Sequence, residues 1–215
     1  ACLVGSEMCI RDSYNSDREQ IGKTELTQGT ASVTIPEQGF DPGTFYIQVK
    51  TNAMTNVNWS GAEQYTLTAD FTPTDSTYES EPNDSTSRAD VMLPNTPVSG
   101  KLSDESDVDY YKVTLDSAAQ FSLCLEHALP DDLSSSGTPW TVTCYPFDEK
   151  TGTLREDKAV TLDAALGKTK TESETVLVRG GTYYVEVRHK GIGGFSDLEY
   201  TLTLSLIHIS EPTRH

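Results

Sequence analysis

Basic residues are scarce in this 215-residue chain: 16 Lys and Arg stand against 33 Asp and Glu, which gives a net charge of −17. Nucleic acids and anionic membrane surfaces attract proteins through clustered positive charge. The composition therefore excludes both as expected partners. No apolar run approaches the roughly 20 residues that a membrane-spanning helix needs. The acidic excess is compatible with bound divalent cations, and also simply with solubility.

Sequence motifs of catalytic chemistry are also missing. The chain has no G-x-S-x-G, no H-E-x-x-H and no phosphate-binding glycine loop. The glycines of residues 191–194 predict a turn between strands, because no helical pattern follows them. We therefore expect no enzymatic activity. The alternative is a piece of an enzyme whose active site needs sequence outside this chain.

The two ends of the chain can be encoded by complementary strands of the same DNA sequence. One permitted coding of residues 3–12 has a reverse complement that translates as residues 204–214, residue for residue. A DNA fragment tagged with one adaptor at both ends would show this relation, and the string resembles a transposon-type library adaptor. We therefore exclude both ends, with Cys2, Cys9, His208 and His215, from fold and function. The disfavoured alternative is a short signal segment and a final strand. Without the ends, the net charge is −16.

Two cysteines remain, Cys124 and Cys144, each within a strand-like run. A disulfide between neighbouring strands is compatible with an exported protein. Two reduced cysteines are equally compatible with the sequence, because free Cys is commonly buried. Both alternatives stay open.

Short runs of β-branched and aromatic residues, separated by Gly, Pro, Asp and Ser, recur throughout, and apolar residues rarely follow helical spacing. This pattern predicts an all-β fold. Tyr111, Val113 and Leu115 alternate with Lys112 and Thr114, as in an antiparallel strand with one buried face. The expected strands are residues 31–35, 45–50, 65–71, 110–115, 121–125, 141–145, 175–178, 183–188 and 198–203.

An internal repeat relates two parts of the chain, and its copies end in the same three strands. The matching pairs are residues 33–35 and 176–178 (VTI, VLV), residues 43–50 and 181–188 (GTFYIQVK, GTYYVEVR), and residues 63–68 and 198–203 (EQYTLT, LEYTLT). A full set of earlier strands precedes the second ending, whereas only residues 14–30 precede the first. We expect one complete module after the C-terminal part of another, whose remnant should leave unpaired edges and an uncovered apolar face.

The predicted organisation has five parts, one of which is a linker rich in Pro, Ser, Thr, Asp and Glu. The parts are adaptor-derived residues 1–13, a truncated β module at residues 14–72, the acidic linker at residues 73–90, a complete β-sandwich at residues 79–204 that includes the end of the linker, and adaptor-derived residues 205–215.

Four motifs of the second module follow one another in a characteristic order. Residues 79–85 read ESEPNDS, residues 98–102 read VSGKL, residues 107–113 read DVDYYKV, and the closing GTYYVEVR strand follows. This order resembles the bacterial pre-peptidase C-terminal domain family over residues 79–204. The resemblance implies an antiparallel jelly-roll-like β-sandwich. It also implies an accessory module of secreted bacterial proteases or other exported proteins, at an extracellular or cell-surface location.

The resemblance further implies a calcium site, since family members bind calcium between the acidic opening and the loop before the D-Y-Y strand. Calcium takes about six to eight oxygen ligands, and closely packed carboxylates repel one another unless a cation or solvent screens them. The alternative is a solvated acidic loop beside a disordered linker. Carried over by position, the candidate ligands are Glu79, Glu81, Asn83, Asp84, Asp107 and Asp109, with Asp104 as a weaker addition.

The expected function is that of a non-catalytic spacer in a larger secreted protein, stiffened by calcium at the linker. Its partners would be the other domains of the same parent protein, and the chain would be monomeric. The alternative is a module that binds an extracellular polysaccharide or a protein such as collagen through exposed aromatic residues. Trp140, Tyr145 and Tyr184 are the candidates for that surface, and packing in or beside the core is the competing role of each.

Overall fold

The computed structural model describes residues 9–26, 32–35, 37–51, 65–73, 77–129, 137–192 and 198–208. The chain divides into two compact units, unit 1 (residues 1–74) and unit 2 (residues 75–215). Regular structure in the described residues consists of strands and one short 3-10 helix, η1 (Glu156–Lys158). The all-β prediction is confirmed. Nowhere in the described ranges is there a helix long and apolar enough to cross a membrane.

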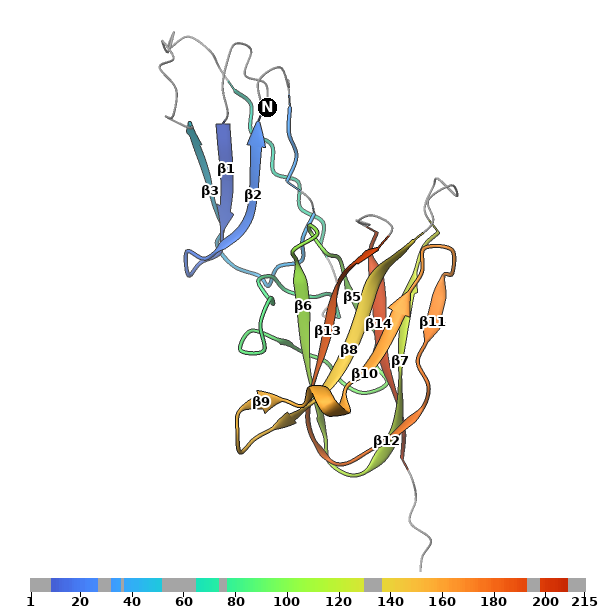
Figure 1. Ribbon diagram of the computed structural model, residues 1–215. Helices are drawn as coiled ribbons and strands as arrows, with labels where there is room; N and C mark the ends of the chain where they lie inside the picture. Colours follow the sequence, from blue (N-terminus) through green and yellow to red (C-terminus); the bar gives the residue numbers. More distant parts are fainter. Residues whose placement is uncertain are drawn as a thin grey trace, which may run out of the picture. The chain divides into compact units, whose positions relative to one another are not determined.

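Unit 2 is a β-sandwich of two sheets (Figure 1). The β13 sheet has the strand order β10-β8-β13-β6-β4, with β9 beside β8, and the β7 sheet has the order β11-β7-β14-β5, with β12 beside β7. All of these pairings are antiparallel except that of β4 with β6. The strands are β4 (Asp90–Val91), β5 (Val98–Gly100), β6 (Val108–Leu115), β7 (Ala119–His127), β8 (Thr138–Asp148), β9 (Thr153–Leu154), β10 (Val160–Ala164), β11 (Lys170–Glu172), β12 (Val176–Val178), β13 (Gly181–Ile192) and β14 (Tyr200–His208).

The core of unit 2 lies between the two sheets and follows the period-two pattern of the strands. In β6 the side chains of Tyr111, Val113 and Leu115 are buried, whereas Lys112 and Thr114 are exposed, as the sequence predicts. Full burial of one Val or Leu side chain stabilises a fold by about 1.5–3 kcal/mol. Both sheets supply such residues, among them Val113, Val142, Val185 and Val187 from one sheet and Phe121, Leu123, Leu125 and Leu202 from the other.

The strand β14 continues into the segment that the sequence analysis assigns to adaptor. Leu204 is 1% exposed and lies opposite Leu123, and Leu206 lies opposite Phe121. Leu204 and Leu206 alternate with Ser205, so these residues fit the pleat whatever their origin. Residues 204–208 are thus the end of a strand in the structure.

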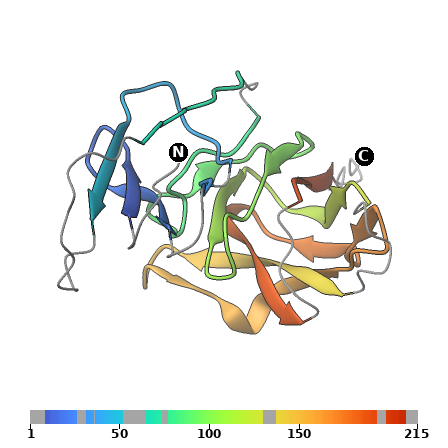
Figure 2. The same cartoon turned by 90° about the horizontal axis from the view of Figure 1, so that it is seen from above.

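Unit 1 contains one three-stranded antiparallel sheet in the order β2-β1-β3, whose strands lie side by side in Figures 1 and 2. The strands are β1 (Cys9–Tyr14), β2 (Gln20–Leu26) and β3 (Tyr46–Thr51), so most of β1 also lies in an assigned adaptor segment. This order matches β10-β8-β13 of unit 2. The register matches too, because Tyr46 faces Tyr14 as Tyr184 faces Tyr145. The repeat thus has a counterpart in strand pairing.

Two predicted strands of unit 1 are not strands in the structure. Residues 32–35 and 65–71 have no regular secondary structure, and Ala31 lies outside the described residues. The counterpart of residues 65–68 in unit 2 is β14, which pairs with β7 and β5. A strand needs partners for its backbone groups, and unit 1 shows no second sheet within its described residues. A strand-like sequence alone is therefore not enough to form a strand when no partner strand lies beside it.

The two cysteines are free. Cys124 lies on β7 and Cys144 on β8, which belong to different sheets. Cys144 faces the core, where burial raises the pKa of its thiol to about 12. The disulfide alternative is therefore wrong, and both cysteines are buried and reduced.

Candidate metal centre

Residues 77–91, here called the strap, cross the open edges of both sheets of unit 2. At the start of the strap, the Ser99 N–H donates to the Thr77 carbonyl (3.0 Å) and the Glu79 N–H donates to the Ser99 carbonyl (2.9 Å). These bonds add the strap to the edge of the β7 sheet at β5. At its end, β4 pairs in parallel with β6 of the β13 sheet. The strap is thus fastened to both sheets.

Three carboxyl groups meet beneath the strap. Glu79, Glu81 and Asp109 each place one oxygen within 4.8 Å of the others. Glu79 and Glu81 are two positions apart, so they point to the same side of the extended strap, and Asp109 lies on the buried face of β6. Their exposed fractions are 2%, 8% and 0%. The sandwich therefore encloses three acidic groups rather than leaving them in solvent.

Three buried oxygens at this place have no hydrogen-bond partner: Glu81 Oε1, Asn83 Oδ1 and Asp109 Oδ1. The Asn83 amide nitrogen donates to Glu79 Oε2 and to Asp90 Oδ2, at 3.4 Å each. These bonds hold the amide so that its oxygen is left unpaired. A buried polar atom without a partner costs about 1–3 kcal/mol, whereas a cation would bind such oxygens favourably.

Two tyrosine hydroxyls close the inner side of the cluster. The Tyr111 hydroxyl donates to Glu79 Oε2 (3.0 Å) and lies 2.6 Å from the Tyr200 hydroxyl, which donates to Asp109 Oδ2. Gly100 lies against this group, since a Cβ there would be 2.5 Å from the Tyr200 hydroxyl and 2.6 Å from Glu79 Oε2. The hydroxyls fix one oxygen each of Glu79 and Asp109, and the glycine leaves room for them.

Burial raises the pKa of every carboxyl group in the cluster. It raises the pKa of Glu79 to about 7 and that of Glu81 to about 9, where the negative charges of Asp107 and Glu79 add to the effect. Burial holds the pKa of Asp109 well above its ordinary value, and the negative charge of Glu79 makes the next largest contribution. The ion pairs of the described residues all lie elsewhere. Without a cation, protons must neutralise this site.

The structure brings together four of the seven predicted ligands, Glu79, Glu81, Asn83 and Asp109. Asp107 borders them: it is 7% exposed, its carboxylate accepts the Ser103 N–H (2.5 Å), and burial raises its pKa.

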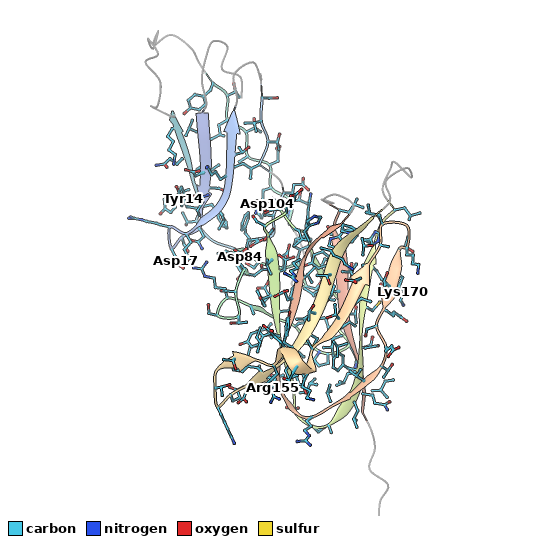
Figure 3. All side chains as sticks on the ribbon, viewed as in Figure 1. Tyr14, Asp17, Asp84, Asp104, Arg155 and Lys170 are labelled. Carbon is cyan, nitrogen blue, oxygen red and sulfur yellow. The ribbon has the colours of Figure 1, made fainter. Side chains whose placement is uncertain are left out.

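Asp84 and Asp104 are exposed and lie near the end of the sandwich where β6 begins (Figure 3). Asp104 accepts hydrogen bonds from the N–H (2.7 Å) and the hydroxyl (2.6 Å) of Ser106. This bonding is typical of a turn, and Asp104 is not one of the three acidic residues, Glu79, Glu81 and Asp109, that the described structure groups together.

Sequence reasoning missed Tyr200, Gly100 and Asp90, and it assigned Tyr111 to the core alone. A signal was available for the tyrosines, because a buried Tyr usually has a partner for its hydroxyl. No comparable signal marks Gly100, whose role depends on atoms from three other segments.

The predicted aromatic surface is only partly present. Trp140 is fully buried in the core of unit 2, with its ring 4.6 Å from that of His127, so its assignment to ligand binding was wrong. Tyr145 and Tyr184 lie opposite each other on β8 and β13, with their side chains on the outer face of the β13 sheet. Tyr184 is only 7% exposed and contacts Phe147, whereas Tyr145 is half-buried.

Several solved structures are similar to this chain, whereas no family model and no curated protein matches it. One is the pre-peptidase C-terminal domain of a collagenase from Bacillus anthracis, with 16% identity over 54% of this chain and 94% of that chain, at a TM-score of 0.40. Another is a protein from Sulfurospirillum deleyianum, with 14% identity over 51% of this chain and 98% of that chain, at a TM-score of 0.34. The first is a domain of the kind that the motif order of this sequence resembles.

Proposed function

We propose that unit 2 is a non-catalytic accessory module of a larger exported protein, and that one calcium ion fixes its strap to both sheets. The observation that carries this proposal is the set of three buried, unpartnered oxygens on Glu81, Asn83 and Asp109. They come from the strap and from β6, and Glu79 adjoins them. A cation held by these groups would join the strap to the sandwich.

The donor set favours calcium over the transition metals. It consists of carboxylate and amide oxygens, with no His nitrogen or Cys sulfur within the cluster of Glu79, Glu81 and Asp109. Hard cations prefer such oxygen ligands, and calcium accepts them in flexible geometry. Glu79, Glu81, Asn83 and Asp109 would hold the ion, which would supply the positive charge that the enclosed carboxylates lack.

The position of the site suggests a mechanical role. Residues 77–89 of the strap precede β4, the first strand of the sandwich, so the strap is where any preceding domain connects to unit 2. Binding of an ion to the folded state alone stabilises that state, and here it would also fix the strap. A flexible connection would become a defined spacer at the extracellular or cell-surface location that we propose.

Thermal unfolding in calcium and in chelator tests this proposal. We expect calcium to raise the midpoint of unfolding of unit 2, and Glu81→Gln to reduce that rise, because it removes a charged ligand. Glu126→Gln is the matched control, since Glu126 is an exposed residue of β7 that forms an ion pair with Lys170. Equal midpoints in calcium and chelator, or equal responses of the two variants, would contradict the proposal.

A second proposal, a ligand surface on the β13 sheet, is favoured by one observation. Both units place a pair of tyrosines opposite each other at equivalent positions, Tyr145 with Tyr184 and Tyr14 with Tyr46. An aromatic pair on an outer sheet face offers apolar area with polar tips, which suits a neutral polysaccharide or a fibrous protein such as collagen. Tyr145→Ala should then reduce retention on insoluble polysaccharide or collagen, whereas equal retention of variant and parent chain would exclude this surface.

A further inference from the structure

The outer edge of β3 in unit 1 corresponds to an edge that is occupied in unit 2. In the β13 sheet, β13 pairs with β8 on one side and with β6 on the other. By repeat and by register, β3 is the counterpart of β13. Among the described strands, however, β3 pairs with β1 alone. An unpaired edge presents N–H and C=O groups that can pair with another strand.

The equivalent residues of β3 and β13 differ in exposure. Ile47 of β3 is 42% exposed, whereas its counterpart Val185 in β13 is 0% exposed. Phe45 is 39% exposed, and its counterpart Tyr183 is 6% exposed. These positions are apolar in both copies, and in unit 2 the core between the two sheets buries them.

We propose that the outer edge of β3 accepts a strand of the β6 type, namely an extended peptide in which apolar or aromatic residues alternate with polar ones, as in residues 107–115. Addition of a strand to a sheet edge is a general mode of peptide recognition, in which backbone hydrogen bonds supply affinity and alternate side chains supply specificity. The occupant is taken from the repeat itself, because unit 2 places this sequence beside the equivalent strand.

The register of unit 2 defines the expected pairs. Tyr183 faces Val113 and Val185 faces Tyr111 in the sandwich, so Phe45 and Ile47 would face the same two peptide residues.

On the other face of the sheet, Lys112 of the peptide would lie opposite Tyr46, which would place a cation beside an aromatic ring, a favourable pair. Tyr110 would lie opposite Gln48, at the position where its hydroxyl donates to Glu186 in unit 2 (2.5 Å).

The backbone bonds of β6 show which of its N–H groups would face β3. The Lys112 carbonyl accepts the Met92 N–H (3.0 Å) and the Tyr110 N–H donates to the Asn83 carbonyl (3.1 Å), so both residues direct their backbone groups to the strap side. Alternate residues of an antiparallel strand bond to opposite neighbours. Tyr111 and Val113 therefore direct theirs to β13, and in the peptide to β3.

The test uses the full chain and a fluorescent peptide with the sequence of residues 107–115, followed by anisotropy. We expect saturable one-to-one binding. Backbone N-methylation at the positions of Tyr111 and Val113 should weaken binding by about tenfold or more, because it removes the donors that face β3. The same modification at Lys112 and Thr114 is the matched control and should change the affinity by less than about twofold.

Two variants locate the binding site on the protein. Ile47→Asp should weaken binding of the unmodified peptide by about tenfold or more, because it places a charge on β3 directly opposite the aromatic residue at the Tyr111 position of the peptide. Leu177→Asp should not, since Leu177 is a 69% exposed residue of unit 2. Absence of saturable binding, or equal effects of the two methylation patterns, would overturn the proposal. So would sedimentation of the chain as a dimer that Ile47→Asp dissociates, because a second copy would then occupy the edge.

Discussion

At the scale of single residues, the acidic centre of unit 2 holds three carboxyl groups that are buried away from solvent. Glu79, Glu81 and Asp109 are enclosed by the strap and β6, where an ionised carboxylate loses most of its hydration. Hydrogen bonds from Tyr111 and Tyr200 satisfy one oxygen each, which does not offset the loss. Either protons or a cation must therefore compensate the charge, and the two compete.

This competition predicts a dependence of stability on pH. In chelator, the folded chain holds protons on Glu79 and Glu81 up to pKa values of about 7 and about 9, whereas the unfolded chain loses them near the ordinary value of 4.5. A carboxyl group whose pKa is higher in the folded state stabilises that state at pH values below its unfolded-state pKa. This stabilisation is lost as the pH rises toward its folded-state pKa. The midpoint of thermal unfolding should therefore fall between about pH 5 and about pH 8 in chelator.

Calcium should reverse this trend, because the ion binds the deprotonated groups. The difference in unfolding midpoint between calcium and chelator should grow from about pH 5 to about pH 8. Glu81→Gln, which cannot titrate, should show a smaller pH dependence in chelator than the parent chain. A calcium effect of equal size at both pH values would contradict the assignment of these carboxylates as ligands.

Gly100 offers a second prediction at this scale. In Gly100→Ala the new Cβ would lie 2.5–2.7 Å from the Tyr200 hydroxyl, Glu79 Oε2 and the Tyr111 hydroxyl. Insertion of a methyl group into a filled site costs about 1–3 kcal/mol. We expect a lower midpoint of chemical denaturation and weaker calcium binding, measured by titration calorimetry. Gly167→Ala is the control, because no atom lies within 4 Å of its Cβ position.

At the scale of elements, backbone partners decide which segments are ordered. The strap has little regular structure of its own, yet it is held by bonds to Ser99 on one sheet and by the pairing of β4 with β6 on the other. Residues 65–71 have a strand-like sequence and remain irregular, because unit 1 shows no partner strand for them within its described residues.

The strap bonds predict a local response to calcium removal. The amides of Glu79, Ser99 and Tyr110 all donate to carbonyls in or next to the strap, so their hydrogen exchange should accelerate in chelator. Amides at the centre of β13 bond to β6 and β8 within the sheet and should keep their protection. Mass spectrometry of exchanged peptides measures both. Uniform acceleration across unit 2 would point to global destabilisation instead of release of the strap.

At the scale of the whole molecule, the two units differ in how completely they bury their apolar residues. Unit 2 encloses a core between two sheets, whereas the described residues of unit 1 form one three-stranded sheet and expose Phe45, Tyr46 and Ile47 by 39–53%. Buried apolar area is the main source of folding stability, and a short sheet with one open face is marginal alone.

We therefore expect the two units to unfold separately, with unit 1 first. In hydrogen exchange, the amides of β1–β3 should be protected orders of magnitude less than those of β6, β8 and β13, and they should exchange fully at a temperature where unit 2 is intact. Val185→Ala should lower the midpoint of unit 2 by removing a fully buried side chain, without effect on unit 1. A single cooperative transition in which both units lose protection together would contradict this expectation.

Much of unit 2 could be predicted from sequence because the patterns involved are local. Alternation of apolar and polar residues placed the buried face of β6, and the repeat placed β3 and β13 at equivalent positions. Short strands such as β4 and β5 were not predicted, since two or three residues carry no period and become strands only beside a neighbour.

By itself, the sequence determined the all-β class and the acidic charge, because composition and period-two alternation are properties of neighbouring residues. Its motif order, through a family resemblance, also named Glu79, Glu81, Asn83 and Asp109 as candidate ligands. Only the tertiary structure decided that these four residues meet, that Asp104 closes a turn, that Trp140 is enclosed in the core and that the two cysteines lie in different sheets. Each of these outcomes depends on contacts between strands that are distant in the chain, and pairing across a sandwich leaves no local signal.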